Sequence, residues 1–338
     1  MNFSRNAFRH IYIEEELLQD PGAKRILCQF PDAVIIPVRR YTDVFSRSNQ
    51  NPMVQRQYPN LILARKHGTF LYEGAPVCHH FGHTRFYYTS SIINCLFDCE
   101  YCWLKGMYST ADIVLFLNLE DYFRETEQLL KDGPLYLSLS FETDMVPLES
   151  ISHQIKDWNA FLLSHETLTA EIRTKSGSTA LFSTLSPCSR LIFAFTLSPE
   201  ELISASEHYT GTLEQRLNAV QAAIDAGFPV RICFDPLICF PGWQDACRRL
   251  VKTTAETIDL SRIQDFSVGT YRQSETYQRR MRRRWPNSPI IQYPYETRDG
   301  YCQYSKQQQE EMEQLMADLL SDYIDPARIF LLKEENIQ

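Results

Sequence analysis

Residues 94–108 read NCLFDCEYCWLKGMY and carry Cys95, Cys99 and Cys102 in a CxxxCxxC pattern. A loop that curls back on itself can turn three thiolates at this spacing toward one inorganic centre. Neither a second CxxC pair nor a pair of histidines follows to complete a zinc site. A cubane iron-sulfur cluster held by three thiolates leaves one iron without a protein ligand. The stretch therefore predicts an enzyme with a [4Fe-4S] cluster, in preference to a structural metal site or core cysteines.

Length and composition set the size and the charge of the protein. With 338 residues, 44% of them hydrophobic, the chain can bury one large core or one core with a small appendage. The net charge is −8, from 34 Lys and Arg against 42 Asp and Glu. This balance argues against a generally basic nucleic-acid coat, but it leaves room for a local basic patch.

The cysteine content and the N-terminal sequence indicate a reducing compartment. The chain has ten cysteines, but it begins MNFSRNAFRH without a charged and then apolar signal segment. Since no apolar run approaches membrane-spanning length, we expect a cytoplasmic protein that contacts no membrane. We expect the cysteines outside the motif to behave mainly as small buried hydrophobes: Cys28, Cys78, Cys188, Cys233, Cys239, Cys247 and Cys302.

The first part of the chain, residues 1–84, is predicted to be an N-terminal extension packed on the main domain. It combines a helical run at 14–27 with an apolar strand at 32–38. Residues 60–65 and 69–72 are predicted to form a hairpin around a turn at 66–68.

Residues 85–275 alternate strand and helix patterns, which predict parallel pairing with right-handed crossovers. The fold class is therefore predicted to be α/β, with a partial TIM-like barrel whose chemistry lies at the carboxyl ends of its strands. The expected strands are 85–92, 113–117, 135–141, 168–174, 191–197, 230–234 and 263–268. The expected helices are 119–131, 153–163, 213–226 and 243–256.

Residues 276–338 depart from this alternation. The run RRMRRRW at 279–285 has five arginines in six residues, which can neutralise phosphates or simply form a solvated face. A β-hairpin at 289–306 with an Asp299-Gly300 turn and a helix at 307–324 follow. Four hairpin tyrosines offer flat faces for stacking an extruded base: Tyr293, Tyr295, Tyr301 and Tyr304.

Polar residues follow several of the predicted strands. FETD at 141–144 follows one strand, and Lys175 follows another. Lys175 can pair with a cofactor carboxylate or remain an exposed cation. Asp235 can bind a ribose hydroxyl or substrate, or it can cap the following loop.

The CxxxCxxC spacing, with an aromatic residue before the last cysteine, resembles the signature of the radical S-adenosylmethionine (SAM) superfamily. The longer stretch FYYTSSIIN followed by CEYCWLKGMY more narrowly resembles the spore photoproduct lyase family of DNA-repair enzymes. IYIEEELL at 11–18, the run at 197–230 and FDPLICFPGW at 234–243 resemble further segments of that family, so the likeness spans most of residues 10–325.

The resemblance implies a partial (β/α)6 barrel with a C-terminal hairpin that enters DNA. It implies that Cys95, Cys99 and Cys102 hold the cluster and that SAM is contacted by Tyr101, Thr143, Lys175 and Thr196. With Asp235 added, these are the expected cofactor-binding residues. The expected nucleic-acid-binding residues are Arg279, Arg280, Arg282, Arg283, Arg298, Tyr301 and Tyr304.

Three positions depart from the family pattern. Phe141 stands where the family has a cysteine that returns a hydrogen atom, Trp103 stands where it has a tyrosine, and Asp235 replaces a small residue. Phenylalanine has no transferable hydrogen of comparable bond strength. Another thiol must then substitute, with Cys302, Cys233 and Cys239 as candidates, or the reaction differs. Tyr101 and Cys302 are the predicted catalytic residues.

The sequence therefore predicts an enzyme that reductively cleaves SAM to a 5′-deoxyadenosyl radical and acts on a thymine-type DNA lesion by carbon-carbon bond cleavage. Its expected partners are DNA and an electron donor, either a reductase or a flavodoxin or ferredoxin. Two alternatives remain open: a radical SAM enzyme with a small-molecule or peptide substrate, and a non-catalytic iron-sulfur or zinc-binding nucleic-acid module.

Overall fold

The structure, a computed structural model, describes residues 7–75 and 78–331. Its larger sheet has the strand order β18-β14-β13-β11-β10-β9-β5-β4, and every neighbouring pair from β5 to β18 is parallel. The described strands β18 and β4 do not pair, so the predicted partial barrel is confirmed. The strands are β4 (Leu71–Glu73), β5 (Phe86–Thr89), β9 (Leu135–Ser138), β10 (Leu168–Thr174), β11 (Leu191–Thr196), β13 (Val230–Leu237), β14 (Asp265–Thr270) and β18 (Ile329–Leu331).

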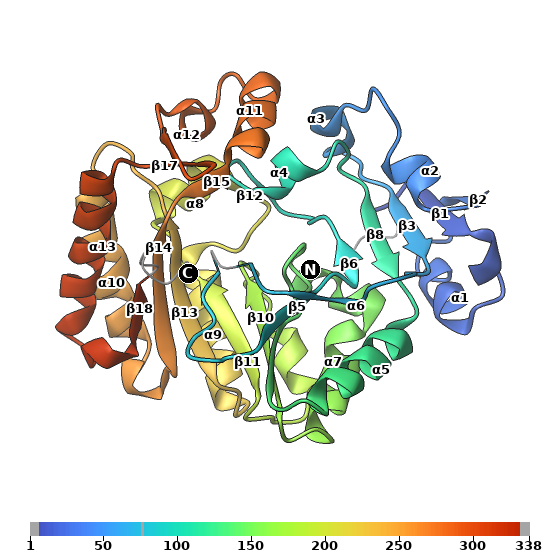
Figure 1. Ribbon diagram of the computed structural model, residues 1–338, viewed down its shortest axis with the longest axis horizontal. Helices are drawn as coiled ribbons and strands as arrows, with labels where there is room; N and C mark the ends of the chain where they lie inside the picture. Colours follow the sequence, from blue (N-terminus) through green and yellow to red (C-terminus); the bar gives the residue numbers. More distant parts are fainter. Residues whose placement is uncertain (1–6, 76–77, 332–338) are drawn as a thin grey trace.

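The barrel strands form where continuous apolar runs are covered on both faces. All six residues of β11, LIFAFT, are buried, as expected for a parallel strand beneath helices. Thr212 and Gln215 close a capping box at the start of α9, and Gly227 takes a positive φ just after its end. The surrounding helices (Figure 1) are α5 (Leu119–Leu130), α6 (Glu149–Ser152), α7 (Gln154–Leu163), α8 (Glu200–Ser206), α9 (Leu213–Asp225), α10 (Trp243–Thr257) and α13 (Lys306–Ser321).

A second sheet of five strands, ordered β2-β1-β3-β8-β6, lies beside the barrel together with α1 to α3 (Figure 1). The prediction that 113–117 is a barrel strand is wrong, because β8 pairs with β3 and β6 in this smaller sheet. The domain division at residue 85 stays a prediction. Strand β4 lies before this residue but belongs to the barrel sheet, whereas β6 and β8 lie after it but belong to the smaller sheet. The strands are β1 (His10–Glu14), β2 (Val34–Val38), β3 (Leu61–Ala64), β6 (Ile92–Ile93) and β8 (Ile113–Phe116).

The predicted hairpin between 60–65 and 69–72 is also wrong, because β3 and β4 belong to different sheets. The segment between them is tied to α5 instead. Asn118 accepts a hydrogen bond from the Lys66 backbone N–H at 2.8 Å and donates to the Lys66 carbonyl at 3.0 Å. The Glu125 carboxylate accepts from the backbone N–H groups of Phe70 and Leu71. Side chains from a distant helix therefore replace the hydrogen bonds that a local hairpin would have made.

The helical run predicted at 14–27 is divided. Residue 14 ends β1, a 3-10 turn covers Glu15–Leu17, and α1 (Pro21–Leu27) begins at a proline whose preceding Asp20 caps the helix by accepting from the Ala23 N–H at 2.8 Å. Two short helices follow, α2 (Thr42–Phe45) and α3 (Pro52–Gln55).

The C-terminal part forms a three-stranded antiparallel sheet, ordered β15-β17-β16. Asp299 and Gly300 both take positive φ values, 48° and 80°, so the predicted tight turn is confirmed. The predicted first arm of the hairpin begins instead as α12 (Pro289–Gln292). The other elements are β15 (Arg272–Ser274), α11 (Glu275–Arg284), β16 (Glu296–Arg298) and β17 (Tyr301–Gln303).

In the described parts of the chain, helices of membrane-spanning length and apolarity are absent.

Candidate active site

The cysteine motif occupies a loop that leaves the smaller sheet after β6 and returns to it at β8, contacting the barrel mouth on the way. Asn94 starts the loop in the left-handed conformation, with φ 73°, and its buried amide donates to the carbonyls of Thr110 and Asp112 at 2.9 and 3.1 Å. The short strand β7 (Asp98–Cys99) pairs antiparallel with β12 (Glu207–His208). The loop is therefore anchored at its start by Asn94 and at β7 by the distant strand β12.

Basic side chains hold the backbone of the same loop. Arg56 donates to the carbonyls of Cys95 and Phe97 at 2.8 and 3.0 Å. The Lys105 ammonium lies 2.7 Å from the Asp98 carboxylate. Lys105 belongs to α4 (Leu104–Met107), so the helix after the motif is tied back onto the loop.

The three motif thiols lie within electrostatic reach of one another. Burial, followed by the charges of Asp144 and Cys102, raises the pKa of Cys95 to about 12. Burial and the charge of Glu207 raise the pKa of Cys99, and the charges of Cys102 and Cys95 add to this effect. Buried thiols of this kind ionise only beside a compensating positive centre, which suits a set of metal ligands.

Within residues 7–75 and 78–331, no group of three or more His, Cys, Asp or Glu side chains could hold a metal ion. The three thiolates of a cubane bind three different irons, so they need not meet around one ion. The thiol set therefore fits a cluster by its chemistry, its spacing and its fixed loop.

Glu207 is the centre of a buried polar network beside the loop. Its carboxylate accepts hydrogen bonds from Tyr101, from Ser198 at 2.8 Å and from Lys175 at 3.1 Å, and it pairs with Arg216. Although burial alone would raise it, the charges of Lys175 and Arg216 lower the pKa of Glu207 to about 2. Sequence reasoning missed Glu207, because its four partners come from four other segments of the chain.

Tyr101 and Lys175, two predicted cofactor-binding residues, meet in this network. Lys175 donates to the Tyr101 hydroxyl at 2.9 Å. Since Glu207 also accepts from Lys175, the ammonium is already paired within the protein. Lys175 is therefore not simply an exposed cation, because it is half-buried and has a protein carboxylate as partner. Its pairing with a cofactor carboxylate stays a prediction.

The predicted threonines lie at two strand ends. Thr196 is buried at the end of β11, where its carbonyl accepts from Arg216 at 2.9 Å. Thr143 is buried in the turn after β9, and its hydroxyl reaches the carbonyl of Asp144 at 3.4 Å. Asp144 accepts from the Thr174 hydroxyl at 2.9 Å and the Lys175 N–H at 2.8 Å. These contacts bring the carboxyl ends of β9, β10 and β11 together around the cysteine loop.

Asp235 lies on the next strand, β13, and its carboxylate pairs with Arg173 at 3.0 Å. It is half-buried, and it does not join the Glu207 network. The ion pair shows that Asp235 interacts across the barrel interior with β10, rather than capping the loop that follows it.

Phe141 lies in an aromatic cluster at the barrel mouth. Its ring stacks on Tyr88 with centroids 4.0 Å apart and an interplanar angle of 26°. Trp103, the residue after Cys102, packs against it at 5.4 Å. Two of the three positions that depart from the family pattern, Trp103 and Phe141, therefore touch each other, next to the cysteine loop.

The predicted thiol Cys302 lies elsewhere. It is buried on β17 opposite Gln273 and Thr297, with its sulfur 3.6 Å from the Thr297 hydroxyl. Cys233 is completely buried within β13, and Cys239 donates its backbone N–H to the Tyr304 hydroxyl at 2.8 Å. Among the described contacts, none joins these three cysteines to Tyr101 or Phe141.

Cys78, which sequence reasoning left among the core cysteines, is nearer the site. It is partly buried, and its charge interactions involve Arg173 and Asp235 in the barrel interior and Tyr88 at the mouth. Burial raises the pKa of Cys78, so the sulfur keeps its hydrogen at neutral pH. The only sequence signal was its place shortly before the first barrel strand.

The arginine run lies on α11, and its members divide into two groups. Arg282 donates to the carbonyls of Ile291 and Tyr293, and Arg284 donates to those of Lys105 and Tyr108. Arg279, Arg280 and Arg283 are exposed, although Arg279 pairs with Glu275 at 2.7 Å and Arg280 reaches the Gly106 carbonyl at 3.3 Å. Part of the run therefore fastens α11 to α4 and α12, and part faces solvent.

The hairpin residues are similarly divided. Tyr304 is 1% exposed and packs against Tyr293 and Tyr295, so the expectation that its ring offers a face for a base is wrong. Tyr295, 9% exposed, is excluded for the same reason. Arg298 binds Glu296, Gln309 and the Tyr304 carbonyl within its own region. Tyr301 is partly exposed, with Arg272 over its ring at 5.7 Å.

The sequence and the fold are similar to those of proteins with a known activity. The family model described as spore photoproduct lyase matches residues 85–332. The chain is 19% identical to the spore photoproduct lyase of Clostridium acetobutylicum, over 96% of this chain and 98% of that protein. It is 21% identical to the enzyme of Bacillus subtilis, over 68% and 70% of the two chains.

Two solved structures have the same fold. A spore photoproduct lyase mutant with bound AdoMet and dinucleoside spore photoproduct superposes with a TM-score of 0.83 at 18% identity, covering 96% of this chain and 98% of the other. A spore photoproduct lyase complexed with the dinucleoside spore photoproduct gives 0.81 at 17% identity, covering 98% and 99%.

Proposed function

Since the chain belongs to the spore photoproduct lyase family of radical SAM enzymes, we propose that it repairs a thymine-type lesion of the spore photoproduct kind in DNA. The repair breaks the carbon-carbon bond that joins the two thymines. One observation carries the proposal: the CxxxCxxC loop lies against the Glu207 network at the mouth of the barrel. The barrel has the fold of the family over nearly the whole chain.

Cys95, Cys99 and Cys102 would hold a [4Fe-4S] cluster. Together with SAM, that cluster supplies a 5′-deoxyadenosyl radical that removes a hydrogen atom from the substrate. The loop is suited to this role because Arg56 and the β7–β12 pairing fix its backbone. We expect the protein to act in a reducing cytoplasm, with a flavodoxin, a ferredoxin or a reductase as electron donor.

SAM would lie between the cluster loop and the ends of β9, β10 and β11, against Tyr101, Thr143, Lys175 and Thr196. Glu207 contributes by fixing the Lys175 ammonium and the Tyr101 hydroxyl in one orientation, which limits their reorganisation when the cofactor binds. Asp235 would lie beyond this group and face substrate or ribose from β13.

The hydrogen atom that completes repair must come from a side chain other than Phe141. We propose Cys78 as the donor thiol. It lies near enough to Tyr88 to interact with it electrostatically, and the ring of Tyr88 stacks on Phe141. Its S–H bond would break homolytically, with the hydrogen atom joining the thymine carbon and the unpaired electron passing to sulfur. Cys302, named from the sequence, is a weaker candidate because it is buried within the C-terminal sheet.

DNA would approach across α11 and the C-terminal hairpin. Arg279 and Arg283 are exposed there, and Tyr301 is partly exposed at the hairpin turn. Arg280 is also exposed. Arg282, Arg298 and Tyr304 would support the shape of this surface rather than contact phosphates, since they bind or pack against neighbouring protein groups.

Anaerobic turnover tests the proposal. The reconstituted protein is incubated with dithionite, SAM and dinucleoside spore photoproduct, and both the thymine dinucleoside and 5′-deoxyadenosine are quantified. We expect both products from the wild type and neither from Cys99→Ala. Formation of 5′-deoxyadenosine without repaired thymine would contradict the lesion substrate and favour a small molecule or a peptide. Absence of both products from a protein that contains four irons would contradict the activity itself.

A further inference from the structure

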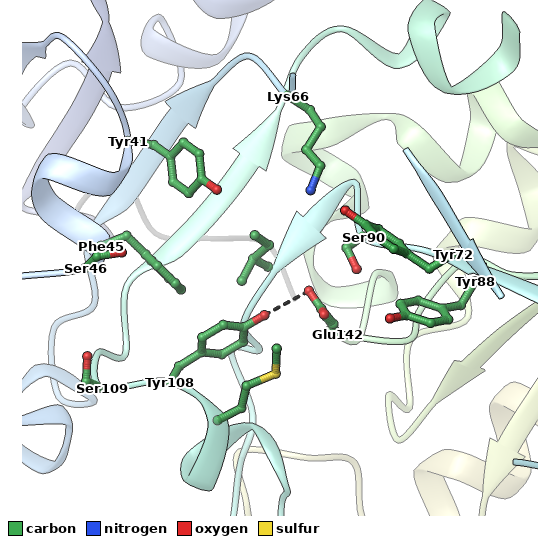
Figure 2. Close-up of a pocket in the computed structure, with 12 residues that line it drawn as sticks. Tyr41, Phe45, Ser46, Lys66, Tyr72, Tyr88, Ser90, Tyr108, Ser109 and Glu142 are labelled. Carbon is green, nitrogen blue, oxygen red and sulfur yellow. Dashed lines mark hydrogen bonds between the residues drawn. The ribbon is translucent and has the colours of Figure 1, made fainter. Parts of the chain in front are cut away.

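A cavity of about 520 Å³ lies next to the aromatic cluster at the barrel mouth, between the smaller sheet and the barrel (Figure 2). Its volume is within the range of about 300–1,000 Å³ that is typical of small-molecule sites. Tyr88 joins it to the candidate active site, because the same ring lines the cavity and stacks on Phe141. Glu142, another lining residue, directly follows Phe141 in the chain.

The cavity walls are largely aromatic. Tyrosines from four separate segments line it, and Figure 2 shows their rings around a common space. Tyr72 and Tyr88 come from the neighbouring strands β4 and β5, where their rings stack at 5.3 Å. Tyr41 comes from the residue before α2, and Tyr108 from the end of α4. Flat rings on several sides favour a flat ligand.

Two opposite charges face this space. The Lys66 ammonium projects into the cavity (Figure 2), and its nearest described partners are aromatic rings, Tyr72 and Phe116, each at 5.4 Å. Glu142 is 8% exposed, and among the described side chains only the Tyr108 hydroxyl donates to its carboxylate, at 2.9 Å. Lys66 and Glu142 form no ion pair with each other, so each retains capacity for a ligand.

Ser90 provides an independent indication that the cavity receives a polar ligand. The residue is 4% exposed and lines the cavity, yet its hydroxyl has no hydrogen-bond partner among the described residues. A buried hydroxyl without a partner costs roughly 1–3 kcal/mol, so such groups are usually satisfied by a water or a ligand. Its oxygen points toward the open space in Figure 2.

We propose that this cavity binds one nucleobase of the substrate strand, namely a base with a ring N–H beside a carbonyl: thymine, uracil or guanine. Glu142 accepts the ring N–H, Lys66 donates to the carbonyl oxygen, Ser90 bonds to the remaining edge, and the tyrosine rings contact the faces. In their neutral forms, adenine and cytosine have a ring-nitrogen acceptor beside an exocyclic amino group, so they cannot present a ring N–H to Glu142 and an adjacent carbonyl to Lys66. The inference rests on the proposed function in one respect, that the substrate is a nucleic acid.

Calorimetric titration with nucleosides tests the cavity without turnover. Full-length protein is titrated with thymidine, 2′-deoxyguanosine, 2′-deoxyadenosine, 2′-deoxycytidine and N3-methylthymidine. Thymidine and 2′-deoxyguanosine should bind at least about tenfold more tightly than the other three nucleosides. Equal affinity for thymidine and N3-methylthymidine would overturn the proposal, because the methyl group removes the N–H that Glu142 accepts.

Variants then locate the site. Glu142→Gln, Lys66→Met and Ser90→Ala should each weaken thymidine binding about fivefold to tenfold, and Glu142→Gln should also reduce the discrimination against N3-methylthymidine. Glu127→Gln and Lys131→Met are the matched controls, since both residues are exposed on or next to α5 and neither lines the cavity. Thermal melting checks that each variant is folded. Unchanged thymidine affinity in all three folded cavity variants overturns the proposal.

The outcome is separable from that of the repair assay. A wild type that fails to repair the dinucleoside but binds thymidine in a Glu142-dependent manner would disprove the proposed function and leave the base site standing. A wild type that repairs the lesion, with thymidine affinity unaffected by Glu142→Gln and Lys66→Met, would disprove the base site alone.

Discussion

The ring of Phe141 stacks on the ring of Tyr88 at 4.0 Å, so a position expected to donate hydrogen is instead part of an aromatic wall. If Cys78 is the donor, repair in D2O by the wild type should place one deuterium in the product, because the thiol exchanges with solvent. Cys78→Ala should lose this label and slow repair, while SAM cleavage continues. Mass spectrometry of the released thymine dinucleoside measures the label.

The double variant Cys78→Ala/Phe141→Cys is the matching gain-of-function test. A thiol at position 141 would face the same aromatic cluster, so the deuterium label should return, at least in part. Cys302→Ala is the control and should leave labelling unchanged. A label that disappears in Cys302→Ala and persists in Cys78→Ala would reverse the assignment.

Glu207→Gln should be strongly destabilising. The substitution leaves the buried Arg216 and the half-buried Lys175 without their carboxylate, a loss of about 3–5 kcal/mol in the free energy of unfolding. Glu201→Gln removes an exposed partner of Arg249 and should cost at most about 1 kcal/mol. Urea denaturation of the two variants measures the difference in the free energy of unfolding. Similar losses in the two variants would contradict a stabilising role of the Glu207 network.

Stability should depend on pH through Glu149. Its carboxylate accepts from the N–H groups of Ile155 and Lys156, but burial dominates and raises its pKa from 4.5 to about 7. The folded state then binds the proton more tightly than the unfolded state. This stabilisation is present below pH 4.5, is on the order of 3 kcal/mol, and is lost as the pH rises through about 7.

Glu149→Gln should remove this part of the pH dependence. Chemical denaturation at intervals between pH 4.5 and 7.5 gives the slope for wild type and variant. Glu207 contributes in the opposite direction, because its lowered pKa stabilises the fold above the unfolded value and this stability is lost as the pH falls toward 2. Identical slopes for wild type and Glu149→Gln would contradict the assignment.

DNA binding should depend on salt through the exposed arginines of α11. Arg279→Gln/Arg283→Gln removes two exposed charges, so the slope of log K against log salt should fall by about 2 for duplex DNA. Arg248→Gln, an exposed arginine on α10, is the control and should not change the slope. Binding without salt dependence in the wild type would rule out this surface.

The barrel was predictable from sequence because its strands are continuous apolar runs whose partners are adjacent in the chain order. β10 and β11, for example, lie within the predicted ranges and pair with each other. The elements that sequence analysis placed wrongly are those whose pairing partners are distant in the sequence. β8 joins the smaller sheet through β3, and the segment after β3 is held by Asn118 and Glu125 of the α5 region. Local patterns contain no information on such pairings.

The candidate site residues likewise fall into those that the sequence could predict and those that it could not. Cys95, Cys99 and Cys102 could be grouped because a single loop carries them. Glu207, Ser90 and Lys66 could not, since each gains its role from side chains on other segments. Tyr304 was misjudged because an aromatic-rich hairpin pattern does not distinguish a ring facing a partner from a ring facing the core.

The cysteine loop is completed by residues that are synthesised long after it. Asp98 and Cys99 pair with Glu207 and His208, and a Cβ on Gly106 of α4 would lie 2.4 Å from the Cβ of Tyr277 on α11. A nascent chain that has not yet reached about residue 284 therefore presents three thiols on an unsupported segment, open to oxidation or to stray metal. A cluster held by these thiols would then be assembled late, after the barrel and α11 have left the ribosome.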